Sequence, residues 1–330
     1  VNGCWQCHGS TVKVLENGAL DPATWPNTGI GRINPDGSHG TCAACHSRHQ
    51  FSAAQARQPE NCGKCHMGPD HPQIEIYNES KHGIAYRANR EKMNMDVSKW
   101  IVGEDYYAAP TCATCHMSQT RKQPVTHDVG DRLSWNNRPP VSKKQGWVEG
   151  TMGWEERRDG MKDVCQSCHE EGWVENWYIQ YDGLVEMYNR KFGEPGVKLM
   201  KAAKPLMKGP KFGNKLDFVW FELWHHEGRR ARMAASMMGP DITHWEGTYD
   251  LGKNFYTEMV PELQELIEHG KHGSAEDKKA AANLEKVLDE VLNHDSHKWF
   301  IGKEDAKKAA ERKQRQAEFK ERYQKTGGSR

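Results

Sequence analysis

Apolar residues recur along the C-terminal half of the chain at the three- and four-residue spacing that is typical of amphipathic helices. This spacing predicts helices within residues 216–238, 259–267 and 284–292. Residues 303–325 are rich in Ala, Glu, Lys, Arg and Gln and predict a long charged helix, which is either solvated or packed against neighbouring subunits. No alternation of apolar and polar residues lasts long enough to build a sheet, so we expect an all-α fold.

The N-terminal half lacks this regularity. Residues 17–40 are rich in Gly and Pro and predict loops and turns. Residues 80–94 predict a short helix, and residues 126–141 predict an extended strap that crosses the fold. We therefore expect an irregular N-terminal part at 1–172 and a helical C-terminal part at 173–330.

All ten cysteines fall into five Cys-x-x-Cys-His motifs. The motifs are Cys4-Cys7-His8, Cys42-Cys45-His46, Cys62-Cys65-His66, Cys112-Cys115-His116 and Cys165-Cys168-His169. Paired zinc sites would leave one motif over and would not explain the histidine after each second cysteine. A disulfide scaffold does not suit a long chain with sparse cysteine. The pattern indicates five covalent c-type haems, each with two thioether bonds and a proximal histidine on the iron.

The composition fits a chain whose core is largely porphyrin. Hydrophobic residues make up only 36% of its 330 residues, and haem can supply the missing apolar bulk. Lys plus Arg number 46 against 45 for Asp plus Glu, and each haem adds two propionates, so the assembled protein should be acidic. This charge argues against nucleic acid as a partner. No apolar run is long enough to span a membrane.

The start of the chain bears on its location. It opens with Val1-Asn2-Gly3-Cys4, without a signal peptide. Haem is attached to such motifs outside the cytoplasm, so we expect that the sequence lacks the protein's own beginning. The expected compartment is a periplasm or its equivalent, such as the lumen of an anammoxosome.

The histidines outnumber the proximal ligands. Of 17 histidines, five are proximal by motif, and haems that only relay electrons need a second axial ligand. We expect distal ligands among the histidines in haem-dense sequence or on a haem-facing helix. These are His39, His49, His82, His127 and either His225 or His226. Four others near the ends of polar helices are favoured there by the helix dipole alone, namely His269, His272, His294 and His297.

Asp70 and His71 follow the third motif directly. One interpretation is a turn in which Asp70 caps the chain. The other is a proton acceptor, His71, that Asp70 orients and keeps basic above an open iron. Sequence spacing alone does not choose between them.

Several long sequence segments, in a fixed order over almost the whole chain, resemble those of the multihaem hydroxylamine oxidoreductase family. They are Cys42-Ala-Ala-Cys-His-Ser-Arg-His49, Gly68-Pro-Asp-His-Pro-Gln73 with Ser80-Lys-His-Gly83, Thr126-His-Asp-Val129 through Arg138-Pro-Pro140, and Trp224-His-His-Glu-Gly-Arg-Arg230. The resemblance implies an octahaem, homotrimeric, secreted enzyme that oxidises hydroxylamine or hydrazine. Its electrons would pass through bis-histidine haems to a cytochrome acceptor.

The resemblance also assigns roles to residues. The catalytic haem matches Cys42-Cys45-His46, and the catalytic pair matches Asp70 and His71. In oxidative members, a tyrosine from a neighbouring subunit is linked covalently to the catalytic porphyrin; Tyr249 is the best match and Tyr256 the second. The C-terminal part would thus contribute a haem ligand, this tyrosine and trimer contacts.

Two departures from the family leave rival functions open. The chain has five motifs where the family has eight, and reductive members of the wider group lack the tyrosine. One rival is a reductive enzyme that converts nitrite or hydroxylamine to ammonia on the same scaffold, although the Cys-x-x-Cys-Lys motif of five-haem nitrite reductases is missing here. The other rival is a pure electron carrier in which every iron has two protein ligands.

Overall fold

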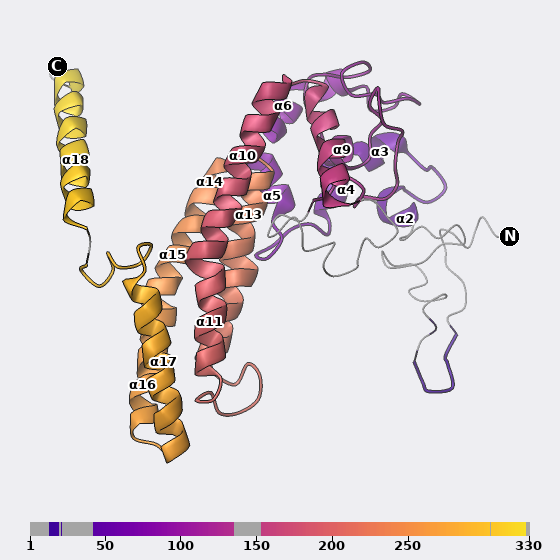
Figure 1. Ribbon diagram of the computed structural model, residues 1–330. Helices are drawn as coiled ribbons and strands as arrows, with labels where there is room; N and C mark the ends of the chain where they lie inside the picture. Colours follow the sequence, from indigo (N-terminus) through magenta and orange to yellow (C-terminus); the bar gives the residue numbers. More distant parts are fainter. Residues whose placement is uncertain (1–12, 20, 22–41, 135–152, 304, 328–330) are drawn as a thin grey trace. The chain divides into compact units, whose positions relative to one another are not determined.

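The computed structural model describes residues 13–19, 21, 42–134, 153–303 and 305–327 (Figure 1). The chain forms two compact units, one from residues 1–186 and 226–249, the other from 187–225 and 250–330. Within the described residues there is no strand beyond an isolated bridge between Val102 and Tyr106. The all-α prediction is confirmed. No helix in these parts of the chain combines the length and the apolar character needed to cross a membrane.

The first unit begins with short helices around the haem motifs. They are α2 (Cys42–Cys45), α3 (Ala53–Arg57), α4 (Pro59–Gly63), α5 (Gln73–Glu79), α6 (Lys81–Asn89), η1 (Arg90–Met93), α7 (Cys112–His116) and α9 (Trp154–Gln166). Side chains define several starts: Ser52 Oγ accepts from Gln55 N, and Ser80 Oγ accepts from Gly83 N. These caps therefore define where one short helix ends and the next begins between successive motifs.

An aromatic cluster supports the fourth motif. Trp100 stacks on Tyr106 with ring centroids 4.0 Å apart, and its Nε1 donates to the Met93 carbonyl over 2.7 Å. The buried Tyr106 hydroxyl donates to Thr114 Oγ1, inside α7, over 2.9 Å. Because both polar tips have partners, the rings can be fully buried beside the attachment helix without an unsatisfied group.

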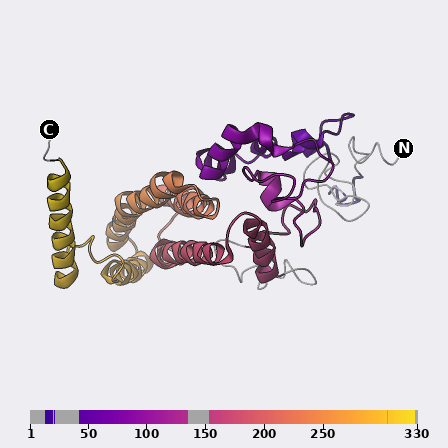
Figure 2. The same cartoon turned by 90° about the horizontal axis from the view of Figure 1, so that it is seen from above.

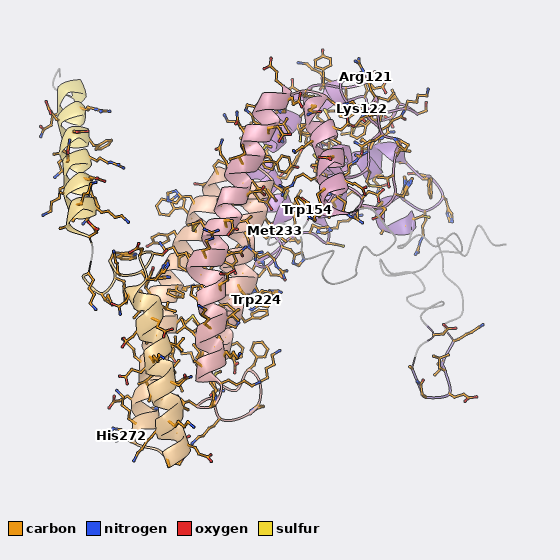
Figure 3. The ribbon with its side chains drawn as sticks, viewed as in Figure 1. Arg121, Lys122, Trp154, Trp224, Met233 and His272 are labelled. Carbon is orange, nitrogen blue, oxygen red and sulfur yellow. The ribbon has the colours of Figure 1, made fainter. Side chains whose placement is uncertain are left out.

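This unit is completed by the long helix α10 (Glu171–Tyr188), whose last two residues belong to the second unit, and by the shorter α13 (Gly228–Ser236), α14 (Pro240–Ile242) and η4 (Thr243–Tyr249). Helix α13 packs on α5 through a small cluster of Ile76, Ala234 and Ile242. Gln73 on α5 also donates to the sulfur of Met233 on α13, labelled in Figure 3, over 3.5 Å. Sequence segments far apart thus meet next to the Asp70–His71 turn.

The second unit is a helical bundle with its own core. Its elements are η2 (Asn189–Gly193), α11 (Glu194–Ala203), α12 (Lys215–Phe221), η3 (Glu222–Glu227), α15 (Asp250–Asn254), η5 (Phe255–Met259), α16 (Val260–Lys271), α17 (Ala275–Asn293) and α18 (Ala306–Gly327). Helices α16 and α17 lie side by side (Figures 1 and 2). Fully buried Leu199, Phe255, Met259, Leu263 and Leu284 fill the core between these helices. Apolar spacing of three and four residues produces these faces.

The π-helical turns are a departure from the expected pattern. The segment 216–238 was expected as one α-helix, but η3 separates α12 from α13, and η2, η4 and η5 interrupt other helices in the same way. A π turn holds one residue more than an α turn, so the apolar face changes direction after it. Apolar spacing located the helices but not these interruptions, and it missed α10 and α11.

Candidate functional site

The four described Cys-x-x-Cys-His motifs each form one helical turn. The histidine N–H donates to the carbonyl of the first cysteine at His46 (2.9 Å), His66 (3.0 Å) and His169 (2.9 Å), and α7 contains the whole Cys112–His116 motif. Residues three and four apart share a helix face, so both thiols and the imidazole point to the same side. This arrangement fits a covalently bound haem. The motif at Cys4, Cys7 and His8 and the candidate His39 lie outside the described residues.

Two proximal imidazoles are held in the orientation that an iron ligand needs. The Nδ1 of His46 lies 3.3 Å from the Ser52 carbonyl, and the Nδ1 of His116 lies 3.2 Å from the Val129 carbonyl. A proton on Nδ1 donated to these carbonyls leaves Nε2 for the metal. Burial lowers the pKa of both imidazoles, which favours the neutral form that binds iron.

The thiols of successive motifs lie close to one another. Burial and then the neighbouring Cys62 raise the pKa of Cys45. A hydrogen bond joins the thiols of Cys62 and Cys112, lowering the pKa of Cys62 and raising that of Cys112. Burial and then Cys165 raise the pKa of Cys115 to about 12. The attachment sites therefore follow each other in space in the order in which they occur in the sequence.

His82 faces the proximal histidine of the last motif. The ring centroids of His82 and His169 are 6.2 Å apart. A metal–imidazole bond is about 2 Å long, so two imidazoles on opposite sides of one iron have centres roughly 6 Å apart. Burial, and then the charge of His169, lower the pKa of His82. The pair has the separation that two axial ligands of one haem require.

The other candidate distal ligands among the described residues lie in different surroundings. His49 is exposed and adopts a left-handed backbone with φ 69°. His127 is exposed and lies near enough to His46 to lower its pKa further. His225 stacks on Phe221 with centroids 4.3 Å apart in the region of η3, and His226 follows it at the boundary between the two units. Their roles as ligands stay predictions.

Asp70 and His71 form a hydrogen-bonded pair in the turn before α5. The Nδ1 of His71 bonds to Oδ1 of Asp70, and its Nε2 lies 3.2 Å from the Cys65 carbonyl. The His71 ring meets the His66 ring edge-on, with centroids 6.3 Å apart. That separation resembles the one between His82 and His169, but both nitrogens of His71 already face acceptors. The contacts place the pair directly beside the third motif.

Sequence reasoning gave no role to Arg229. Its Nη1 lies 3.5 Å from Oδ2 of Asp70, on the carboxylate oxygen that His71 does not use. Helix α13 brings this arginine to the turn because α13 packs on α5. The run Trp224–Arg230 contained the residue, but only the fold shows which carboxylate it approaches.

The two candidate tyrosines lie in different surroundings. Tyr249 ends η4, is 54% exposed and meets Trp245 edge-on at 5.5 Å. Tyr256 is 8% exposed, and its hydroxyl is hydrogen-bonded to Nδ1 of His297 over 2.8 Å. Burial raises the pKa of Tyr256 to about 12. A ring that must reach a neighbouring subunit has to be accessible, a condition that Tyr249 meets and Tyr256 does not.

Comparison with known proteins identifies the family. A family model described as "Seven times multi-haem cytochrome CxxCH" matches residues 31–205, more than half of the chain. The chain belongs to this multihaem cytochrome family. The four attachment motifs within this match are therefore haem c sites, in agreement with their geometry.

Individual relatives point to the same group of proteins. The chain is 50% identical over 88 residues to a probable nitrite reductase–hydroxylamine oxidoreductase fusion protein of Kuenenia stuttgartiensis; the match covers 23% of the chain and 10% of that protein. The chain thus spans about a tenth of this curated relative's length.

Two solved structures share the fold. A hypothetical multihaem protein aligns with TM-score 0.62 and 27% identity, covering 82% of this chain and 68% of its own. A reducing hydroxylamine-oxidoreductase-like complex, Kustc0457/Kustc0458 of Kuenenia stuttgartiensis, aligns with TM-score 0.57 and 19% identity, covering 69% and 59%. The second match shows the fold alone.

Proposed function

We propose that this chain is the catalytic part of a multihaem oxidoreductase that oxidises hydroxylamine, or hydrazine, at the Cys42–Cys45–His46 site. The observation that carries the proposal is the Asp70–His71 pair, which Arg229 holds at Asp70 and which lies beside the third attachment motif. The resemblance to the hydroxylamine oxidoreductase family and the relative in Kuenenia stuttgartiensis support it.

The protein's own residues manage the protons. A haem held by Cys42, Cys45 and His46 would supply a redox-active iron able to bind a nitrogen ligand and take up electrons. Every electron withdrawn from an N–H or O–H group must be matched by a proton that leaves. His71 accepts the proton at Nε2 when the substrate replaces the Cys65 carbonyl as its partner. Asp70 fixes the ring at Nδ1 and stabilises the positive charge that it acquires.

Contacts between the second and third motifs provide the first step of an electron route. Asn61 Nδ2 donates to the Cys45 carbonyl over 2.9 Å, and Lys64 Nζ donates to the Ala44 carbonyl over 3.4 Å. Helix α4 thus holds one attachment site against the next. The thiol contacts continue this order through Cys112 to Cys165, and we propose that electrons leave along it to a cytochrome-type acceptor.

We further propose that His82 and His169 bind one iron, and that Tyr249 is the residue linked to the catalytic porphyrin of a neighbouring subunit. The exposure of Tyr249 supports this assignment over Tyr256. The assignment requires a neighbouring subunit, and from the family resemblance we propose a homotrimer in an extracytoplasmic compartment. A reductive enzyme on the same scaffold would lack the crosslink, and an electron carrier would lack both the crosslink and an iron with an open position.

The test uses the haem-loaded protein. Steady-state oxidation of hydroxylamine and of hydrazine is measured with a cytochrome c acceptor, beside mass spectrometry of the haem peptide that contains Cys42 and Cys45. We expect turnover, a high-spin haem and a peptide linked to Tyr249. In Tyr249→Phe the link should vanish and oxidation should weaken, whereas Tyr256→Phe should keep the link. Only low-spin haem and no turnover would exclude the proposal.

A further inference from the structure

Arg132 is a buried cation next to the fourth attachment motif. Its side chain is 3% exposed. The guanidinium donates to the carbonyls of Thr114 (3.4 Å), Cys115 (3.3 Å) and Ser118 (2.6 Å), which form the end of α7 and the turn after it. Its Nε donates to Gln123 Oε1 over 3.2 Å. All these acceptors are uncharged, so none of these bonds pairs the cation with a carboxylate.

Gln123 connects Arg132 to the fifth motif. Gln123 Nε2 donates to Asp163 Oδ2 (2.6 Å) and to the Gly160 carbonyl (2.9 Å), both on α9. Thr120 Oγ1 also donates to Asp163 over 2.6 Å. Because α9 ends in the turn with Cys165, the network fixes the fourth and fifth attachment turns relative to each other through Arg132 and Gln123.

Burying a charge whose hydrogen-bond acceptors are all neutral costs stability, so its presence calls for a role other than stabilising the fold. Taking a guanidinium out of water is costly, and carbonyl dipoles recover part of that cost. The negative end of the α7 turn favours a cation there. The guanidinium also donates to the carbonyl of Cys115, whose sulfur would carry a thioether bond, so its field would act on a haem attached there. Asp131 and Asp163 are nearby and reduce this field without removing it.

We propose that Arg132 sets the reduction potential of the haem attached at Cys112, Cys115 and His116, and holds its attachment turn in place. A cation in a low-dielectric site stabilises the reduced haem, which carries one positive charge fewer than the oxidised haem. An electron that passes between the third and fifth attachment sites would then reside preferentially on this haem. The inference rests on haem attachment alone and not on the proposed substrate.

The experiment compares Arg132→Gln and Arg132→Lys in the haem-loaded protein by spectroelectrochemical titration, with haem content checked by mass. Arg132→Gln should move one low-spin midpoint to a more negative potential. The midpoint should shift by at least ~59 mV, which for a one-electron couple is a tenfold decrease in the equilibrium constant for reducing that haem. Arg132→Lys keeps the charge and should keep most of the potential.

A matched control is Arg158→Gln. Arg158 is also buried, at 7% exposed, but its guanidinium is bidentate on Asp182 over 2.7 and 2.9 Å, so its charge is already neutralised. Its loss should lower stability and leave the midpoints in place. Unchanged midpoints in Arg132→Gln overturn the proposal. If Arg132→Gln does not assemble with haem, Arg132→Lys decides. Its charge is retained, so a midpoint that is ~59 mV or more below that of the unmodified protein would show that the charge is not the cause.

Discussion

The guanidinium of Arg229 lies 3.5 Å from Oδ2 of Asp70, while Oδ1 of the same carboxylate bonds to His71. Each oxygen of Asp70 therefore has its own partner. A carboxylate held at both ends cannot rotate freely, and neither can an imidazole bonded to it. The orientation of His71 thus depends on a residue that lies far away in the sequence, on α13.

Replacing Arg229 by Gln should lower kcat for hydroxylamine oxidation about tenfold, equivalent to ~1.4 kcal/mol, because His71 would lose its fixed orientation. Arg229→Lys should recover part of the rate. Steady-state kinetics with a cytochrome acceptor measure both. The control is Arg121→Gln, since Arg121 is 79% exposed and pairs only with Glu104 over 2.7 Å (Figure 3). A change in KM alone would contradict a positioning role.

His82→Ala should convert one low-spin haem to high spin, because an axial imidazole of the haem at Cys165 and Cys168 would be missing. Optical and paramagnetic-resonance spectra of the oxidised protein report this change. His272→Ala serves as control, since His272 is 78% exposed at the end of α16 (Figure 3). Spectra of His82→Ala that match those of the unmodified protein would remove His82 from the ligand set.

Gly247→Ala should destabilise the packing of η4 on α13. A Cβ at this position would lie 2.6 Å from Ala231 Cα and 2.7 Å from its backbone nitrogen, which cannot move as a flexible side chain does. The expected cost is about 1–3 kcal/mol, with weaker crosslinking at Tyr249. Gly183→Ala in α10 is the control, because its Cβ meets nothing within 4 Å and a helix gains from Ala. Urea denaturation compares the two variants.

The buried His297 should make the protein less stable in mild acid. Burial, and then Lys191, lower its pKa from 6.5 to about 4. The unfolded chain then binds more protons between these values, so the stabilisation is complete above pH 6.5 and is lost as pH falls toward 4. The expected loss is ~1–3 kcal/mol. Urea midpoints at several pH values measure it, and the double variant His297→Phe, Tyr256→Phe should show a flatter profile.

Local features of this fold follow directly from the sequence. The Cys-x-x-Cys-His motifs were recognised from the sequence alone, and each one in the described residues forms a turn from residues within five positions of each other. Apolar spacing located α16 and α17 because each helix buries one face, with Leu263 and Leu284 in the core. Both are consequences of interactions between near neighbours.

The residues that complete the candidate site were less accessible to sequence reasoning. Arg229 meets Asp70 because α13 packs on α5, and His82 on α6 meets His169, which lies far along the chain just after α9. The burial of Tyr256 depends on His297 and on aromatic residues from other helices. Such contacts join distant segments, and a single sequence contains no spacing rule that reveals them.

The direction of the Tyr249 side chain depends on the number of residues in the π turn that ends at this tyrosine. Each residue in a helix advances the next side chain by about 100°, so one residue fewer in Thr243–Tyr249 would swing the phenol to another face without changing any residue type. A lineage could thus redirect or abandon the tyrosine by gaining or losing a single codon. Insertions and deletions, more than substitutions, would then record how such proteins diverged.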